Sequence, residues 1–152
     1  MTPGRLRAEI VADRIGWVRT MVAGLRQLPL GSYQEFQEDV RTPAAAESYL
    51  RRALEALLDL GRHLLARGFG PAVTEYKEIA NALVEGGVLD ERQGGLLREM
   101  AGYRNRLVHF YDEVTHPELY EICAKRSGDI ETVLDAILRW LRADPERLDA
   151  PL

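Results

Sequence analysis

Apolar residues recur every three or four positions through most of the chain, which is the spacing of an amphipathic α-helix. Pro29 ends the first such stretch, and Thr42-Pro43 has the form of an N-cap followed by proline at the first helical position. Asp90, with Gln93 three residues later, has the form of a capping box that opens another helix. We therefore predict helices over residues 6–28, 42–67, 74–86, 90–111 and 117–141, with a short element at 31–40 and an interruption at 127–129.

The pattern contains no strand alternation of useful length and no internal repeat. Short connections between helices favour antiparallel neighbours. The predicted fold class is therefore all-α, an up-and-down bundle of four to five main helices. A length of 152 residues is typical of one domain, so we expect a single helical domain over residues 1–152 with its core at about 5–142.

Composition and charge exclude several classes of protein. Hydrophobic residues make up 46% and charged residues 29%, as in soluble globular proteins, and no apolar run approaches the ~20 residues that span a bilayer. Charges interrupt the N-terminal segment, which argues against a signal peptide, and the single cysteine fits a cytoplasmic protein. A net charge of −4 argues against broad coating of nucleic acid but leaves room for a local basic cleft. The scattered histidines and cysteine have no metal-ligand spacing, so we expect neither metal nor cofactor.

The stretch YRNRLVHFYDEV, residues 103–114, combines helical periodicity with an unusual set of polar side chains. On a helical wheel Arg104 falls within the apolar face that contains Met100 and Tyr111, and an unpaired buried charge is costly. Asn105 and His109 lie toward the opposite side, and Arg104 and His109 diverge by roughly 140° in a straight helix. The two groups can reach one substrate if the helix bends or ends near His109, or if a second copy of the motif lies opposite.

Ordinary structural roles are available for the same residues. The stem of Arg104 could cover apolar surface with its charge in water, and His109 could cap the helix C-terminus. We expect Arg106 to be solvated, His63 to face solvent and His116 to lie in a helix-entry turn. Cys123 is expected to be a small buried apolar residue. Gly61, in mid-helix, indicates the close approach of another helix, either within the bundle or between protomers.

The motif RNRLVHFY resembles the R-x4-H-x-Y signature of HEPN-domain proteins, and specifically the HepT-like toxins of minimal-nucleotidyltransferase toxin–antitoxin pairs of type VII. Arg104, His109 and Tyr111 match the signature, and the helix order from about residue 5 to 142 agrees with it. The resemblance implies a metal-independent endoribonuclease with a composite Arg/His site at a homodimer cleft. It also implies a nucleotidyltransferase antitoxin as partner and Tyr111 as the residue that this antitoxin adenylylates, which inhibits the nuclease.

The residue types suit that reaction. RNA cleavage without a metal needs a deprotonated 2′-OH, a protonated leaving oxygen and a stabilised phosphorane. Histidine titrates near neutral pH, which predicts His109 as general acid or base, and arginine binds phosphate bidentately, which predicts Arg104 as the transition-state ligand. We expect Asn105 to orient one of these two groups.

Two other functions compete with the nuclease. A non-catalytic HEPN module associated with a nucleotidyltransferase would use Arg104 to hold a nucleotide or a partner, and the acidic net charge mildly favours it. A structural bundle would use the motif only for dimerisation. The intact arginine and histidine favour the nuclease, because a pure binder has less need of His109.

Overall fold

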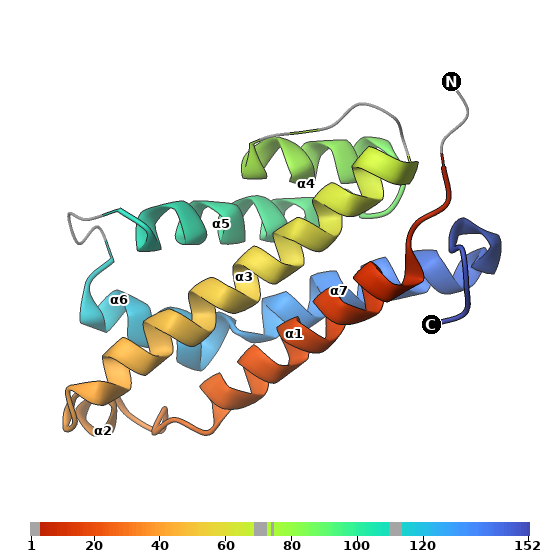
Figure 1. The fold of residues 1–152 in the computed structure, drawn as a ribbon. Helices are drawn as coiled ribbons and strands as arrows, with labels where there is room; N and C mark the ends of the chain where they lie inside the picture. The colour runs from red at the N-terminus through yellow and green to blue at the C-terminus, as the bar shows by residue number, and fades with distance from the viewer. Residues whose placement is uncertain (1–3, 69–72, 74, 110–113) are drawn as a thin grey trace.

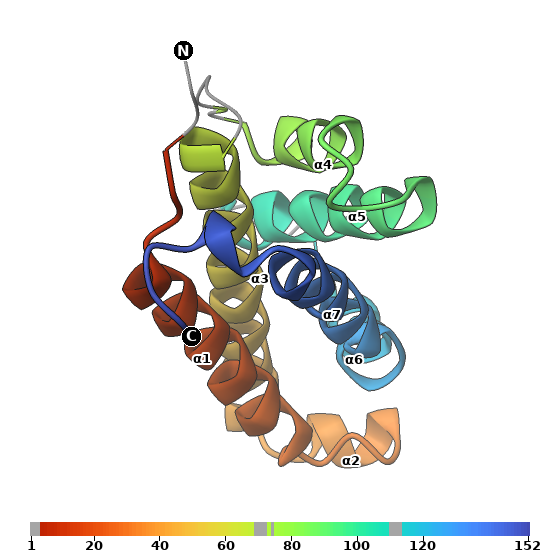
Figure 2. The same ribbon diagram turned by 90° about the vertical axis from the view of Figure 1, so that its right-hand side faces the viewer.

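The computed structural model describes residues 4–68, 73, 75–109 and 114–152, and these residues form a helical bundle (Figures 1 and 2). Five helices have ten residues or more, and they are accompanied by short helical segments. The bounds are α1 Ala8–Arg26, α2 Tyr33–Gln37, α3 Arg41–Gly68, α4 Tyr76–Glu85, α5 Glu91–Leu107, α6 His116–Glu121, a π-helical turn Ile122–Arg126, α7 Gly128–Ala143 and a 3₁₀ turn Pro145–Arg147. The predicted all-α class is confirmed.

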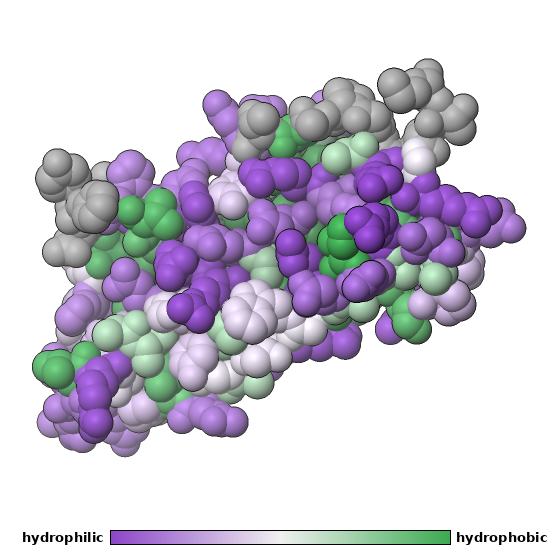
Figure 3. Space-filling view, viewed as in Figure 1, coloured by the Kyte–Doolittle hydropathy of each residue, from purple (hydrophilic) through white to green (hydrophobic). Residues whose placement is uncertain are grey.

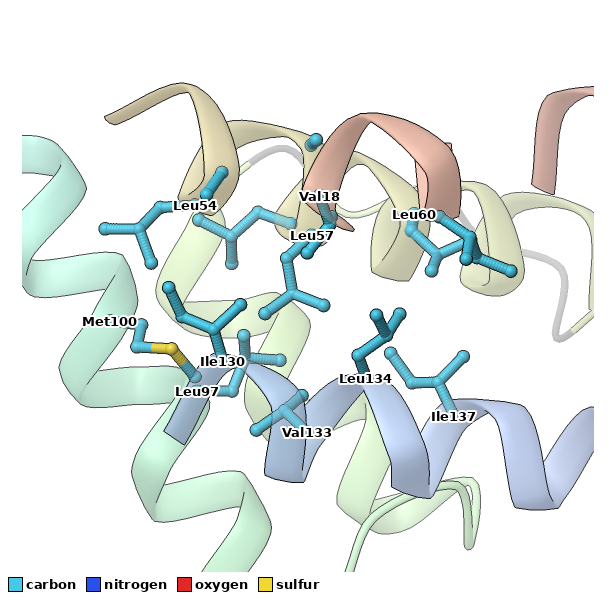
Figure 4. Close-up of a cluster of buried hydrophobic side chains, with 14 of the residues drawn as sticks. Val18, Leu54, Leu57, Leu60, Leu97, Met100, Ile130, Val133, Leu134 and Ile137 are labelled. Carbon is cyan, nitrogen blue, oxygen red and sulfur yellow. The ribbon is translucent and has the colours of Figure 1, made fainter. Parts of the chain in front are cut away.

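The long helix α3 forms the centre of the bundle. It lies along α1 on one side and contacts α4, α5 and α7 on the other (Figure 2). The apolar stripe predicted for this helix is buried, and Leu54, Leu57 and Leu60 of α3 meet side chains of α1, α5 and α7 (Figure 4). The partners labelled there are Val18, Leu97, Met100, Ile130, Val133, Leu134 and Ile137.

The structure confirms one predicted helix start and corrects another. Asp90 accepts a hydrogen bond from the backbone N–H of Gln93 at 2.8 Å, and the Gln93 side chain accepts from the Asp90 N–H at 2.9 Å, so the capping box is present. The expected N-cap at Thr42 is wrong. Helix α3 begins at Arg41, two residues before the expected first helical residue Pro43, and the Arg41 backbone N–H donates to the Asp39 carboxylate at 2.9 Å.

The last predicted helix is divided, as expected at 127–129. Thr115 caps α6 by accepting from the Glu118 N–H, and a π-helical turn links α6 to Ser127, after which α7 begins. His116 is the first residue of α6 and not part of the preceding turn, because Thr115 takes the capping position. Cys123 is buried as expected, and burial raises the pKa of its thiol to about 12.

His63 is half-buried, so the expectation that it faces solvent is wrong. Its Nε2 accepts a hydrogen bond from the backbone N–H of Arg7 at 3.2 Å, which ties α3 to the N-terminal segment. Burial, assisted by nearby arginines, lowers the pKa of this histidine. The same segment pairs with the C-terminal one, since Leu6 N–H donates to the Arg147 carbonyl at 2.7 Å. None of the helices in the described ranges has the length and apolar character needed to cross a membrane.

Gly61 allows a close approach within the bundle and not between protomers. A Cβ at this position would lie 2.9 Å from Ile79 Cγ2 and 3.1 Å from Leu83 Cδ1, both in α4. The absence of a side chain on α3 therefore lets α4 pack against it. This contact fixes α4 beside the motif-bearing helix α5, on which α4 also packs.

Gly94 and Gly95 offer a matched test of the α4–α5 contact. A Cβ on Gly94 would lie 2.3 Å from Cγ2 of the stiff, β-branched Val84, whereas one on Gly95 meets nothing within 4 Å. Gly94→Ala is therefore expected to lower the free energy of unfolding by ~1–3 kcal/mol. Gly95→Ala is expected to raise it by ~0.5–1 kcal/mol, because alanine loses less backbone entropy in a helix. Urea unfolding of both variants checks this, and equal effects would contradict the close packing of Val84 on Gly94.

Candidate functional site

Helix α5 ends just before the histidine of the motif. Its last helical residue is Leu107, Val108 is the C-cap, and the His109 N–H donates to the Arg106 carbonyl at 3.3 Å. A single chain could bring Arg104 and His109 to one substrate if the helix bent or ended near His109, and the structure shows a helix that ends there. The prediction that the helix continues to residue 111 is wrong, and Tyr111 itself lies outside the described residues.

Arg104 is half-buried between three helices, and its guanidinium has partners on each. The Nε atom lies 3.5 Å from the Glu55 carboxylate of α3, and the guanidinium carbon lies 4.6 Å from the centre of the Tyr76 ring of α4. The Nη1 atom donates to the Asn105 side chain at 3.4 Å. The Nε atom makes no hydrogen bond in the described part of the chain, so the ion pair with Glu55 and the Tyr76 ring together restrict the orientation of the guanidinium. Arg104 is therefore a positioned cation, and the alternative of a merely solvated head is wrong.

Glu55 is shared between two arginines. Its carboxylate lies 3.2 Å from Nη1 of Arg51 as well as 3.5 Å from Arg104, and all three side chains are about a quarter to a third exposed. One carboxylate between two guanidinium groups leaves excess positive charge at this place. The contact between Arg104 and Asn105 agrees with the predicted orienting role of Asn105, which stays a prediction.

His109 lies in a different hollow from Arg104. Arg104 and Asn105 line a cleft between α3, α4 and α5, whereas His109 is exposed and lines a hollow of about 240 Å³ beside the start of α6. The second hollow also contains His116. Among the residues that the structure describes, the arginine and the histidine thus line two different hollows of the chain.

Arg106 is paired and half-buried, so the expectation that it is solvated is wrong. Its two terminal nitrogens donate to the two carboxylate oxygens of Glu118, each at 2.7 Å. The arginine lowers the pKa of this carboxyl group. The ion pair joins the last turn of α5 to α6, and it fixes both ends of the segment that carries His109.

Sequence reasoning missed several side chains that gather around Arg104: Arg62, Tyr76, Lys77 and Glu55. The sequence does contain a pattern for part of this group. Arg51, Glu55, Asp59 and Arg62 recur at helical spacing and form a charged ridge on α3. No local pattern marks Tyr76, which reaches Arg104 only because α4 folds back over α5.

The described part of the chain contains no group of three or more histidine, cysteine, aspartate or glutamate side chains that could hold a metal ion. The polar groups on the two hollows are mainly cations and histidines, with few carboxylates. This donor set suits a phosphate group.

An all-α bundle with arginine and histidine at the end of one helix has the architecture of the HEPN class. The pattern of the family described as Ribonuclease HepT-like matches residues 20–137, which include the whole motif. The chain belongs to this family.

Individual relatives are distant but cover most of the chain. The mRNA nuclease HepT of Shewanella oneidensis is 20% identical over 129 residues, which cover 85% of this chain and 96% of that protein. The solved structure of the tri-AMPylated Shewanella oneidensis HEPN toxin in complex with MNT antitoxin matches with a TM-score of 0.77 at 20% identity, over 86% of this chain and 97% of that chain. The cytosolic protein YutE of Bacillus subtilis matches with a TM-score of 0.74 at 20% identity, over 91% and 92% of the two chains. At these identities the solved structures establish the fold.

Proposed function

We propose that this chain is the ribonuclease toxin of a toxin–antitoxin pair and that it cleaves RNA without a metal ion. The observation that carries the proposal is the placement of Arg104, a guanidinium held by Glu55 and Tyr76 at the wall of a cleft, five residues before an exposed histidine. Membership of the Ribonuclease HepT-like family and the name of the Shewanella oneidensis relative support the same reaction.

In the proposed reaction, one His109 takes the proton from the 2′-OH of the RNA. The 2′-oxygen forms a bond to phosphorus, the bond from phosphorus to the 5′-oxygen breaks, and a second, protonated His109 gives its proton to that leaving oxygen. Arg104 stabilises the negative charge that develops on the phosphorane. The products are a 2′,3′-cyclic phosphate and a 5′-hydroxyl.

A homodimer would supply the second histidine. One chain has a single His109, and this residue lines a different hollow from Arg104. Two copies related by a twofold axis would place both motifs against one RNA strand, because a twofold interface brings the same surface of each copy together. The separation of the two residues within one chain is thus the reason for proposing a composite site.

The proposed regulator is a nucleotidyltransferase antitoxin that adenylylates Tyr111. The tyrosine oxygen would attack the α-phosphate of ATP, and pyrophosphate would leave. The added AMP carries negative charge, which would compete with RNA for the cations nearby. The AMPylated state and the MNT antitoxin named for the Shewanella oneidensis toxin support this proposal.

The same separation of Arg104 and His109 also favours a second candidate, a non-catalytic module that binds a nucleotide or a nucleotidyltransferase. Such a protein needs the Arg104 cleft alone. It would bind RNA or nucleotide but leave RNA intact.

One experiment separates the ribonuclease from the non-catalytic module. Purified protein is incubated with a fluorescent single-stranded RNA in buffer with EDTA. We expect cleavage under these conditions, with a 2′,3′-cyclic phosphate on the upstream product. A matched oligonucleotide with 2′-deoxyribose throughout should stay intact, because it lacks the attacking hydroxyl. Loss of cleavage in EDTA, or equal cleavage of the deoxy control, would contradict the proposed mechanism.

A further inference from the structure

The cleft beside Arg104 extends well beyond the motif. It has a volume of about 390 Å³ and is lined by Arg62, Glu75, Tyr76, Lys77, Arg104 and Asn105. These residues come from α3, from the start of α4 and from the last turns of α5 (Figure 1). The surface where these three helices meet is mostly hydrophilic in the space-filling view (Figure 3).

Tyr76 holds two guanidinium groups at the same time. The guanidinium carbon of Arg62 lies 4.9 Å from the centre of its ring, and that of Arg104 lies 4.6 Å from it. Like charges normally keep apart, so the shared aromatic ring stabilises an arrangement that concentrates positive charge. Tyr76 thereby sets the position of Arg62 relative to Arg104.

The cleft has an excess of positive charge on its walls. Of the described residues that line it, Arg62, Lys77 and Arg104 are cationic and Glu75 alone is acidic. Arg62 also lies 3.5 Å from Asp59, and Arg104 the same distance from Glu55. The 3.5 Å contact between Arg104 and Glu55 is longer than the 2.7 Å contacts between Arg106 and Glu118, so the Arg104 guanidinium retains capacity for a ligand.

We propose that Arg62 and Lys77 each bind one backbone phosphate of single-stranded RNA beside the phosphate held by Arg104. This inference rests on the proposed ribonuclease function and deepens it, because it assigns the path of the substrate over α3 and α4. Guanidinium and ammonium groups recognise phosphate oxygens in any sequence. The cleft therefore contributes affinity and register and does not read bases.

Salt dependence of RNA binding tests the proposal. The His109→Ala background prevents cleavage, and fluorescence anisotropy follows a labelled single-stranded RNA as the salt concentration rises. Each phosphate contact contributes a slope of ~0.7 in log affinity against log salt, or about fivefold in affinity near 0.1 M. Lys77→Gln should lower affinity about fivefold, and Arg62→Gln with Lys77→Gln should lower it about 25-fold and reduce the slope by ~1.4.

The matched control is Arg19→Gln with Lys125→Gln, which removes the same two charges from exposed positions on α1 and on the π-helical turn. The RNA affinity of the control should stay within about twofold of that of the His109→Ala background, apart from the small general effect of net charge. Circular dichroism checks folding, and Lys77→Gln alone keeps the test valid if Arg62→Gln unfolds, because Lys77 is exposed.

Three results would overturn the inference: equal losses in the cleft and control variants, no RNA binding at all, or binding of AMP as tight as that of the oligomer. The last result would indicate a pocket for a single nucleotide. If the nuclease proposal is wrong, the unmutated chain leaves the RNA intact. This result is separate from the binding results that test Arg62 and Lys77. RNA binding that depends on Arg62 and Lys77 would then still support the phosphate site.

Discussion

Replacing His109 by alanine is expected to lower the rate of RNA cleavage by ~10²–10⁴, because the reaction loses its proton-transfer group. Arg104→Ala is expected to lower it by ~10²–10³, because the charge on the phosphorane loses its ligand. Neither change should unfold the protein, since His109 is exposed and Arg104 is half-buried at a surface cleft. Single-turnover cleavage of a labelled RNA measures both effects.

The control for both variants is Arg98→Ala. Arg98 is an exposed arginine of the same helix, and its side chain pairs with Asn81 away from the Arg104 cleft. The Arg98→Ala variant should retain the full rate of RNA cleavage. Unchanged cleavage in His109→Ala or Arg104→Ala would contradict the proposed site, and relief of toxicity in cells by His109→Ala would support it.

A mixture of the two inactive proteins tests the composite site within the same experiment. If the arginine of one protomer acts with the histidine of its partner, mixed dimers contain one complete pair. Their activity should then exceed that of either variant alone but stay below that of the unmutated dimer, because a mixed dimer keeps only one of the two histidines of the proposed reaction. No recovery after subunit exchange would show that a single pair formed between protomers is not sufficient for cleavage.

Tyr111→Phe is expected to abolish the AMP adduct that the proposed antitoxin adds to this chain. Co-expression with the antitoxin gene should add one or more AMP masses to the unmutated chain, because each adenylylation adds one phosphodiester-linked AMP. The phenylalanine variant lacks the attacking hydroxyl and should show none, while its ring keeps the same shape. Intact mass spectrometry measures the difference.

The matched control for this prediction is Tyr103→Phe. Tyr103 belongs to the same motif, but its hydroxyl donates to Glu99 at 2.5 Å, and burial together with this contact raises its pKa to about 12. It should accept the same number of AMP groups as the unmutated chain. Adducts that persist in Tyr111→Phe and vanish in Tyr103→Phe would move the modified residue to the other tyrosine.

Much of the fold follows from local rules. Helical periodicity predicted each long helix, and the Asp90–Gln93 capping box predicted the start of α5, because both depend on neighbours along one helix. The exact start of α3 was missed, because the helix begins before Thr42 at Arg41, whose N–H donates to the Asp39 carboxylate. The end of α5 was also missed, because no glycine or proline marks it.

For the site, the sequence alone predicted which residues would carry the proposed chemistry. The motif at 104–109 named the arginine and the histidine, and the position of Arg104 in an apolar stripe showed that it needed a partner. Only the tertiary structure decided what that partner is. Glu55 and Tyr76 come from helices far away in the sequence, and α4 reaches Arg104 because Gly61 lets it pack closely on α3. Long-range packing of this kind leaves no local periodicity, so the cleft of Arg62, Tyr76 and Arg104 appears only in the folded chain.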